Sequence, residues 1–235
     1  MRTVRTLCRA LLYVPGNDPR KVSRALSTPV DCVIFDLEDS VPDHCKTEAR
    51  ARVAAAVAEY RGPARVGVRI NGMASAYGVA DLVALAGVGQ LQTVLVPKVQ
   101  SSQDVAVVQQ VLRQVHPTPK QVSVIASIES ALAVMRVMDI AASPGVDALL
   151  FAAEDYCADV GITRTDARKE LWFARSCVAN AAAAYGLGAM DMVCIKYTDD
   201  AVLEEECVEG RAMGFTGKVC CCLLLYWVVF DMCCV

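Results

Sequence analysis

Short apolar runs alternate with longer segments of helical periodicity through most of this 235-residue chain. Runs of four to seven residues, rich in Val, Ile and Leu and bounded by Gly, Pro, Asn or Asp, are typical of buried β-strands. Such runs lie at residues 10–14, 32–36, 65–70, 93–96, 122–128, 148–153 and 192–195. Helices are predicted at residues 46–60, 80–86, 103–115, 131–141, 165–185 and 202–213, and residues 214–218 lead towards an eighth strand.

The alternation of strands with helices predicts a parallel sheet. The strands are apolar almost throughout, which indicates that both faces of the sheet are covered. Seven or eight such units favour a (β/α)8 barrel, in which functional groups sit at the carboxyl ends of the strands. An open doubly wound sheet is the alternative, but the chain has neither G-x-G-x-x-G nor the P-loop motif that often marks nucleotide sites in such sheets.

Composition narrows the class of protein further. A chain that is 55% hydrophobic can bury one sizeable core. The net charge of −3 and the pI near 5.5 argue against a nucleic-acid partner. No stretch approaches 18 consecutive apolar residues, so a membrane-spanning helix is not expected.

The distribution of cysteines and the N-terminal residues indicate the cellular compartment in which the protein is expected. Of the twelve cysteines, five fall in the last sixteen residues and the others are scattered singly, which suits a reduced intracellular compartment better than a disulfide framework. Residues 1–9 contain Arg2, Arg5 and Arg9 and no acidic residue, which is typical of a remnant of a targeting segment. A mitochondrial location is therefore expected, with a cytoplasmic one as the alternative.

Acidic residues follow one predicted strand closely. Glu154, Asp155 and Asp159 lie within six residues after the run at residues 148–153. A buried strand that delivers carboxylates at its carboxyl end is how parallel α/β folds present metal ligands and catalytic groups. The plainer alternative is a strand that runs out into a solvated acidic loop. Charged or polar residues also follow five other strands: Asn17, Asp18, Arg20, Glu38, Asp39, Arg69, Lys98 and Glu129. If the barrel forms, these groups converge on one mouth.

Carboxylates held close together repel each other, and a bound divalent cation relieves that repulsion. Oxygen ligands without His or Cys favour Mg²⁺ over Zn²⁺. Each residue also has a plainer interpretation. Arg69 could simply pair with a neighbouring carboxylate, Glu129 could cap the following helix, and Glu38 and Asp39 could lie on the surface. His44 and His116 are expected to be solvated and are assigned no role.

Seven short motifs, in order along the chain, resemble one known family. They are Leu-Leu-Tyr-Val-Pro-Gly-Asn at residues 11–17, Phe-Asp-Leu-Glu-Asp-Ser-Val at 35–41, Val-Arg-Ile-Asn-Gly at 68–72, Val-Pro-Lys-Val at 96–99, Ile-Glu-Ser-Ala at 128–131, Ala-Glu-Asp-Tyr at 153–156 and Gly-Phe-Thr-Gly-Lys at 214–218. Together they resemble the HpcH/HpaI aldolase–citrate lyase family, in its citrate lyase β-subunit-like branch with the citramalyl-CoA and malyl-CoA lyases. The resemblance covers about residues 9–218.

The resemblance implies a TIM barrel, Mg²⁺, and cleavage or formation of a carbon–carbon bond through an acetyl-CoA enolate. Glu129 and Asp155 would be the protein ligands of the Mg²⁺. Arg69 would bind the carboxylate of the acid or the thioester oxygen and stabilise the enolate, which would make it the catalytic residue. Glu38 and Asp39 would orient water on the metal.

Other implications concern the substrate and the assembly. Tyr13, Arg20 and Arg24 lie where the family contacts coenzyme A. The substrate would be a 3-hydroxyacyl-CoA thioester, cleaved to acetyl-CoA and a 2-keto acid or formed in the reverse condensation. By resemblance the chain would form a homo-oligomer, a trimer. An aldolase acting on free keto acids is a further alternative, which the segment from Tyr13 to Arg24 disfavours because it suits CoA phosphates.

The likeness ends at Lys218, which predicts three regions: the residual targeting segment at 1–9, the barrel at 10–218, and a Cys-rich apolar tail at 219–235. Members of the family continue through an Ile-His-Pro segment into a helical extension that supplies a catalytic Asp to a neighbouring subunit. The eighth βα unit and this extension are expected to be missing or replaced here, which would expose the edges of the first and seventh strands. The alternative function is therefore a catalytically impaired isoform that binds metal, CoA or partner subunits without turnover.

Overall fold

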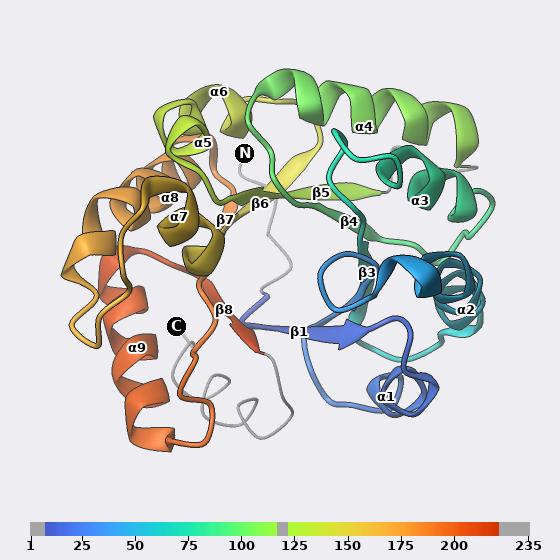
Figure 1. Ribbon diagram of the computed structural model, residues 1–235, viewed down its shortest axis with the longest axis horizontal. Helices are drawn as coiled ribbons and strands as arrows, with labels where there is room; N and C mark the ends of the chain where they lie inside the picture. The colour runs from blue at the N-terminus through green and yellow to red at the C-terminus, as the bar shows by residue number, and fades with distance from the viewer. Residues whose placement is uncertain (1–7, 117–121, 221–235) are drawn as a thin grey trace.

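The computed structural model describes residues 8–116 and 122–220. Within them, eight parallel strands close into a barrel in chain order, as Figure 1 shows. This arrangement confirms the predicted (β/α)8 barrel. The strands are β1 (Ala10–Pro15), β2 (Cys32–Asp36), β3 (Arg65–Arg69), β4 (Thr93–Val96), β5 (Ser123–Ile128), β6 (Val146–Phe151), β7 (Gly188–Asp191) and β8 (Gly217–Cys220).

Helices surround the barrel and cover the outer faces of its strands. Their inner sides are apolar: in α4, for example, the buried residues Val105, Val108 and Leu112 recur every three or four positions. None of the helices in the described ranges is long and apolar enough to cross a membrane. The helices are α1 (Pro19–Ala25), α2 (Lys46–Glu59), α3 (Gly78–Ala84), α4 (Ser102–Val115), α5 (Ala131–Met135), α6 (Val137–Ala141), α7 (Ala153–Val160), α8 (Trp172–Tyr185) and α9 (Asp200–Met213).

Two clusters of buried apolar side chains hold the barrel together. The smaller one fills its interior and includes Leu11, Ile34, Leu95, Leu150 and Val219. The larger one lies between the strands and the surrounding helices. Successive side chains of a strand point to opposite faces, so each strand contributes to both clusters. The strands are therefore apolar throughout, and the polar groups that follow them are left at the mouth.

The eighth strand closes the barrel, which corrects the expectation of open edges on the first and seventh strands. In β8, Lys218 and Val219 pair with β1, and Gly217 and Lys218 pair with β7. The strand reaches Cys220, two residues beyond the predicted boundary at Lys218. Residues 1–7 and 221–235, which include most of the predicted targeting segment and apolar tail, lie outside the described residues.

Several predicted elements were placed wrongly. The seventh strand is Gly188–Asp191, whereas the prediction was the more apolar run at residues 192–195, which lies in the following loop. The helix predicted at 131–141 is divided into α5 and α6 at Arg136, and the one predicted at 165–185 begins only at Trp172. His116 is buried, with its ring Nε2 2.9 Å from the carbonyl oxygen of Val88, so the expectation that it is solvated was wrong.

Candidate functional site

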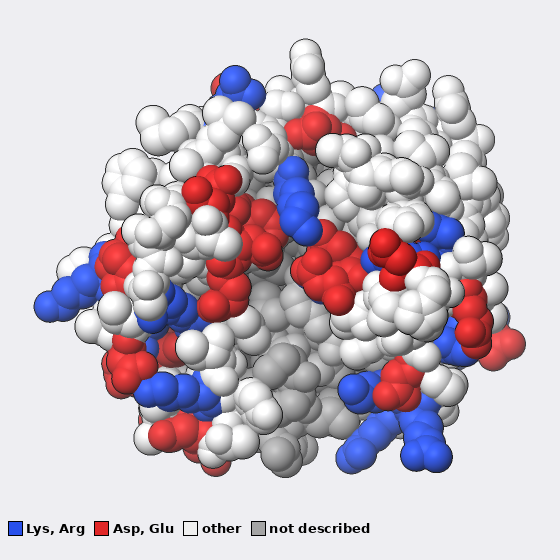
Figure 2. Space-filling model, viewed as in Figure 1, with Lys and Arg blue, Asp and Glu red and all other residues white. Residues whose placement is uncertain are grey.

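The carboxyl ends of the strands form the mouth of the barrel. In Figure 2 this face is hollowed near its middle, and acidic side chains gather around the hollow with basic atoms between them. Two neighbouring cavities open here, with volumes of about 470 and 630 Å³. Met73, Ala74 and Lys98 line both cavities.

Arg69 is held at the mouth by three carboxylates. Its Nε and Nη2 each lie 2.7 Å from an oxygen of Asp36, in a two-pronged pair. Its Nη1 lies 3.1 Å from Glu38 Oε2 and 3.3 Å from Asp39 Oδ2. The guanidinium also stacks on the ring of Tyr13, 4.7 Å from the ring centre. Arg69 therefore does pair with neighbouring carboxylates, and its Nη1 faces the side of the mouth where Glu38 and Asp39 lie.

Asp36 is a site residue that the sequence interpretation missed. It is the last residue of β2, directly opposite Arg69 of β3 in the parallel register, and its side chain is buried. It also accepts hydrogen bonds from the backbone N–H groups of Glu38 and Ser40, at 2.8 and 3.1 Å. Burial opposes its ionisation, but the hydrogen bonds and charge of Arg69, together with the hydrogen bonds from Ser40 and from the N–H of Glu38, outweigh burial and hold the pKa of Asp36 below its usual value. Its only signal in the sequence was a carboxylate ending a buried apolar run.

Glu129 and Asp155 lie together in the smaller cavity. Glu129 directly follows β5 and is 5% exposed, while Asp155 is half-buried in the first turn of α7. Burial, together with the charge and hydrogen bond of Asp155, raises the pKa of Glu129 to about 8, although the N–H of Lys98 donates to it. Ser130, not Glu129, caps α5, because its Oγ accepts the N–H of Ala133 at 3.1 Å. The capping alternative for Glu129 is therefore wrong.

The acidic segment after β6 is a helix, not a loop. Ala153 begins α7, so Glu154 and Asp155 occupy its first turn, where the helix dipole favours negative charge. Asp159, one helical turn on, accepts the N–H of Ala131 at 2.8 Å and thereby ties α7 to α5. Asp155 and Asp159 line the smaller cavity, and Glu154 does not.

The donor set at the mouth fits a hard divalent cation. Glu129 and Asp155 provide carboxylate oxygens on one wall, and the raised pKa of Glu129 reflects its burial and its repulsion from Asp155, both of which a cation would offset. No group of three or more His, Cys, Asp or Glu side chains arranged for a metal is found among the described residues. Mg²⁺ fits such a sparse set, because it commonly keeps several waters and binds through one or two carboxylates plus substrate oxygens.

Glu38 and Asp39 lie across the mouth from this pair and line the larger cavity. Glu38 is buried, and burial raises its pKa although Arg69 and Lys98 oppose the shift. Asp39 is exposed, as one alternative held, whereas Glu38 is not on the surface. Their expected role in orienting water remains a prediction.

A buried polar group that was not predicted fixes the loop carrying these two acids. The ammonium of Lys46, on α2, donates to the carbonyl oxygens of Leu37 and Glu38 and to Oδ1 of Asn71, at 2.7–2.8 Å. Asn71 in turn donates through Nδ2 to Asp81 at 2.6 Å. This chain of bonds ties the end of β2 to α2 and α3, which makes the position of Glu38 rigid.

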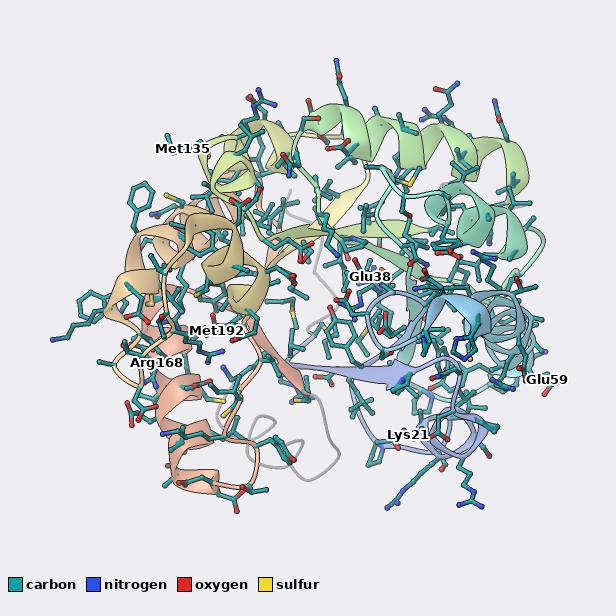
Figure 3. All side chains as sticks on the ribbon, viewed as in Figure 1. Lys21, Glu38, Glu59, Met135, Arg168 and Met192 are labelled. Atoms are coloured by element: carbon teal, nitrogen blue, oxygen red, sulfur yellow. The ribbon has the colours of Figure 1, made fainter. Side chains whose placement is uncertain are left out.

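The residues predicted to contact coenzyme A lie at different depths. Tyr13 is half-buried on β1 beneath Arg69, and burial raises the pKa of its hydroxyl. Arg20 and Arg24 are exposed on α1, the helix that also carries Lys21, which Figure 3 labels. Asp18 caps this helix by accepting the N–H groups of Arg20 and Lys21 at 3.0 and 3.1 Å. The two arginines line neither cavity, so the structure does not bring them together with Glu129 and Asp155.

Fold and site together define a (β/α)8 barrel with an oxygen-lined acidic cavity and a carboxylate-held arginine at the carboxyl ends of its strands. The chain belongs to the HpcH/HpaI aldolase/citrate lyase family, whose sequence model matches residues 9–222. This finding confirms the family that the seven motifs indicated.

Individual relatives agree with the family. The chain is 32% identical over 224 residues to the mitochondrial citramalyl-CoA lyase of Homo sapiens, covering 89% of this chain and 66% of the human protein. It is 34% identical over 220 residues to a citrate lyase subunit beta-like protein of Deinococcus radiodurans, covering 91% and 75% of the two chains. The chain thus spans slightly less than two thirds of the human relative.

Solved structures show the same fold. Protein CitE of Mycobacterium tuberculosis, in complex with magnesium and acetate, superposes with a TM-score of 0.82 at 29% identity, over 99% of this chain and 93% of that one. The same protein in complex with magnesium, acetoacetate and coenzyme A gives a TM-score of 0.80 at 29% identity, over 98% and 82% of the two chains.

Proposed function

We propose that this chain is a Mg²⁺-dependent carbon–carbon lyase or synthase acting on 3-hydroxyacyl-CoA thioesters. Citramalyl-CoA or malyl-CoA would be cleaved to acetyl-CoA and a 2-keto acid, or formed in the reverse condensation. The observation that carries the proposal is the pair of Glu129 and Asp155 in a cavity at the barrel mouth, beside the cluster that holds Arg69. Relatives named for citramalyl-CoA lyase activity and for magnesium and coenzyme A complexes support it.

Glu129 and Asp155 would hold the cation, since they are the paired carboxylates of the cavity. When bound, Mg²⁺ would supply positive charge at the substrate oxygens and fix the orientation of the acid. The raised pKa of Glu129 fits this role, because its carboxylate is destabilised until a cation shares the site. Glu38 and Asp39 would orient water from the opposite wall.

Arg69 would stabilise the charge that develops during cleavage. In the retro-aldol direction the hydroxyl group of the substrate loses its proton and becomes the keto carbonyl. The bond between the hydroxyl-bearing carbon and the α-carbon breaks, and its electron pair moves to the thioester as an enolate, which then takes a proton to give acetyl-CoA. A guanidinium whose Nε and Nη2 are already held by Asp36 stabilises this developing charge with little reorganisation.

The remaining residues would bind the carrier part of the substrate. Arg20 and Arg24, exposed on α1, would contact the phosphates of coenzyme A, and Tyr13 would support Arg69 from below. We also propose assembly as a homo-oligomer, a trimer, and a mitochondrial location. The mitochondrial names of mammalian relatives support the latter.

The test is a lyase assay of the full 235-residue chain with citramalyl-CoA and malyl-CoA, with and without Mg²⁺. Release of acetyl-CoA that requires Mg²⁺ supports the proposal. Cleavage of the corresponding free hydroxy acids at equal rate would instead support an aldolase of free keto acids. Saturable binding of Mg²⁺ and acetyl-CoA without any cleavage would favour the impaired isoform and contradict the lyase.

A further inference from the structure

Lys98 has an unusual backbone for a residue with a side chain. Its φ is 54°, and Arg168 is the other non-glycine residue with a positive φ in the described part of the chain. This left-handed region is strained for residues with a Cβ atom, and such strain persists where surrounding contacts enforce it, often at ligand sites. Lys98 follows β4 after Pro97 and lines both cavities of the mouth.

The backbone of Lys98 holds one wall of the mouth. Its N–H group donates a hydrogen bond to Oε1 of Glu129. The left-handed conformation of Lys98 belongs to the turn after β4 that places this N–H beside the end of β5. The bond fixes one oxygen of Glu129 against the end of β4, so that the carboxylate has little freedom to rotate.

The side chain of Lys98 reaches the opposite wall. Its Nζ lies 2.6 Å from Glu38 Oε1 and 3.7 Å from Asp39 Oδ1, and the side chain is 50% exposed. These are the two carboxylates that also face Nη1 of Arg69.

Arg69 therefore shares its partners with a second cation. Because Asp36 holds Nε and Nη2 of Arg69, Nη1 is the group that can turn from Glu38 and Asp39 to a substrate oxygen. Glu38 is buried, and a buried carboxylate left without a cation is costly. An ammonium that stays on Glu38 removes most of that cost.

We infer that Lys98 is a positioning residue with two separable parts: its left-handed backbone fixes Glu129 for the cation, and its ammonium holds Glu38 and Asp39 so that Arg69 can turn to the substrate. The inference rests on the proposed function. It extends that function by proposing that Lys98 sets the distance between Glu129 on one side of the mouth and Glu38 and Asp39 on the other. The two parts are separable by substitution, because glycine keeps the backbone conformation and loses the ammonium.

The experiment compares Lys98→Gly, Lys98→Val and Lys98→Arg with the full wild-type chain, by Mg²⁺ titration calorimetry and by lyase kinetics. Glycine adopts a positive φ freely, whereas a β-branched residue strongly disfavours it. Lys169→Ala is the control, because it removes an exposed lysine that lines neither cavity. If Lys98→Val does not fold, Lys98→Ala takes its place.

Lys98→Gly is expected to keep the Mg²⁺ affinity within about threefold and to raise KM about tenfold at nearly constant kcat, because Arg69 remains bound to Glu38. Lys98→Val is expected to weaken Mg²⁺ binding about tenfold in addition, as one charge-assisted hydrogen bond to Glu129 is lost. Lys98→Arg should restore KM towards the wild-type value, and Lys169→Ala should change neither quantity.

Equal Mg²⁺ affinities in the glycine and valine variants would overturn the backbone part, and an unchanged KM in Lys98→Gly would overturn the ammonium part. In both cases a wild-type chain that binds Mg²⁺ and cleaves the thioester leaves the proposed function standing. A wild-type chain that binds no Mg²⁺ contradicts the proposed function, and the inference falls with it.

Discussion

Two clusters of charged residues in this barrel are built from the same residue types but differ in their access to solvent. The mouth cluster consists of Asp36, Glu38, Asp39, Arg69 and Lys98, with Lys98 half exposed beside two cavities. The lateral cluster lies between strands β7 and β8 and helices α8 and α9, on the outer side of the barrel. It consists of Arg164, Arg168, Arg175, Asp191, Glu206, Glu209 and Lys218.

The centre of the lateral cluster is closed to solvent, although Arg164 and Arg168 at its edge also pair with the exposed Glu154 and Glu205. The guanidinium of Arg175 is fully buried and lies 2.8 Å from Asp191 and from Glu209. The ammonium of Lys218 is 1% exposed and lies 3.0 Å from Glu206. None of these residues lines either cavity of the mouth. The difference teaches that buried charge alone does not mark a functional site, because a site also needs a face that a ligand can reach.

The largest expected effect on folding comes from breaking the lateral cluster. Asp191→Ala leaves Arg175 and Lys218 buried without their shared carboxylate, so the free energy of unfolding should fall by about 3–5 kcal/mol. Denaturant unfolding measures it. Activity per folded molecule should change little, since Asp191 lies away from both cavities. A loss below about 1 kcal/mol would show that the cluster is not a closed structural unit.

The largest expected effect on chemistry comes from the mouth cluster. Arg69→Ala should lower kcat by about 10²–10³-fold, because it removes a fixed donor from the developing enolate. Its Mg²⁺ affinity should remain nearly unchanged. Arg65→Ala is the matched control, since Arg65 lies at the other end of β3 and pairs with Asp147. A large loss of Mg²⁺ binding in Arg69→Ala would count against the assigned role.

A smaller effect concerns acid stability and the lateral cluster. Burial opposes the ionisation of Glu209, but Arg175 and Arg168 outweigh it and lower its pKa. Its ionised form therefore stabilises the fold above the unfolded value of about 4.3, and this contribution is lost as the pH falls through the lower folded pKa. Glu209→Gln should flatten the decline of Tm below about pH 4. Curves of Tm against pH that run parallel for the wild type and the variant would contradict this prediction.

The smallest effect is expected for an exposed ion pair outside both clusters. Lys196 and Asp166 are 2.8 Å apart, with side chains 45% and 81% exposed. Asp166→Ala should leave the free energy of unfolding nearly unchanged, because water screens the pair. Denaturant unfolding of this variant and of Asp191→Ala compares the two losses of unfolding free energy. Similar losses in the two variants would contradict the account that buried pairs stabilise the fold more than exposed ones.

The barrel was predictable because its strands are apolar on both faces. β2 and β4 were predicted with the observed bounds, since Val, Ile and Leu dominate them. β7 was missed because Gly-Ala-Met-Asp has no β-branched residue, and its pairing with β6 and β8 decides its conformation. Tertiary hydrogen bonding outweighed local propensity there.

The candidate site was predictable in part. Charges after strand ends pointed to Arg69, Glu129 and Asp155, because parallel strands bring their carboxyl ends together. The partners of these residues were not predictable. Asp36 meets Arg69 only through the register of β2 and β3, and the left-handed backbone of Lys98 depends on contacts distant in the sequence.

The most direct test of the central claim is Mg²⁺ titration calorimetry of the full chain beside Glu129→Gln and Asp155→Asn, with Asp147→Asn at the far end of the barrel as control. The wild type and the control should bind with one site per chain. Each amide variant of the cavity should lose at least about a hundredfold in affinity, roughly 2.7 kcal/mol. A wild-type chain that does not bind Mg²⁺, or amide variants that bind it equally well, would contradict the assignment of Glu129 and Asp155 as a cation site.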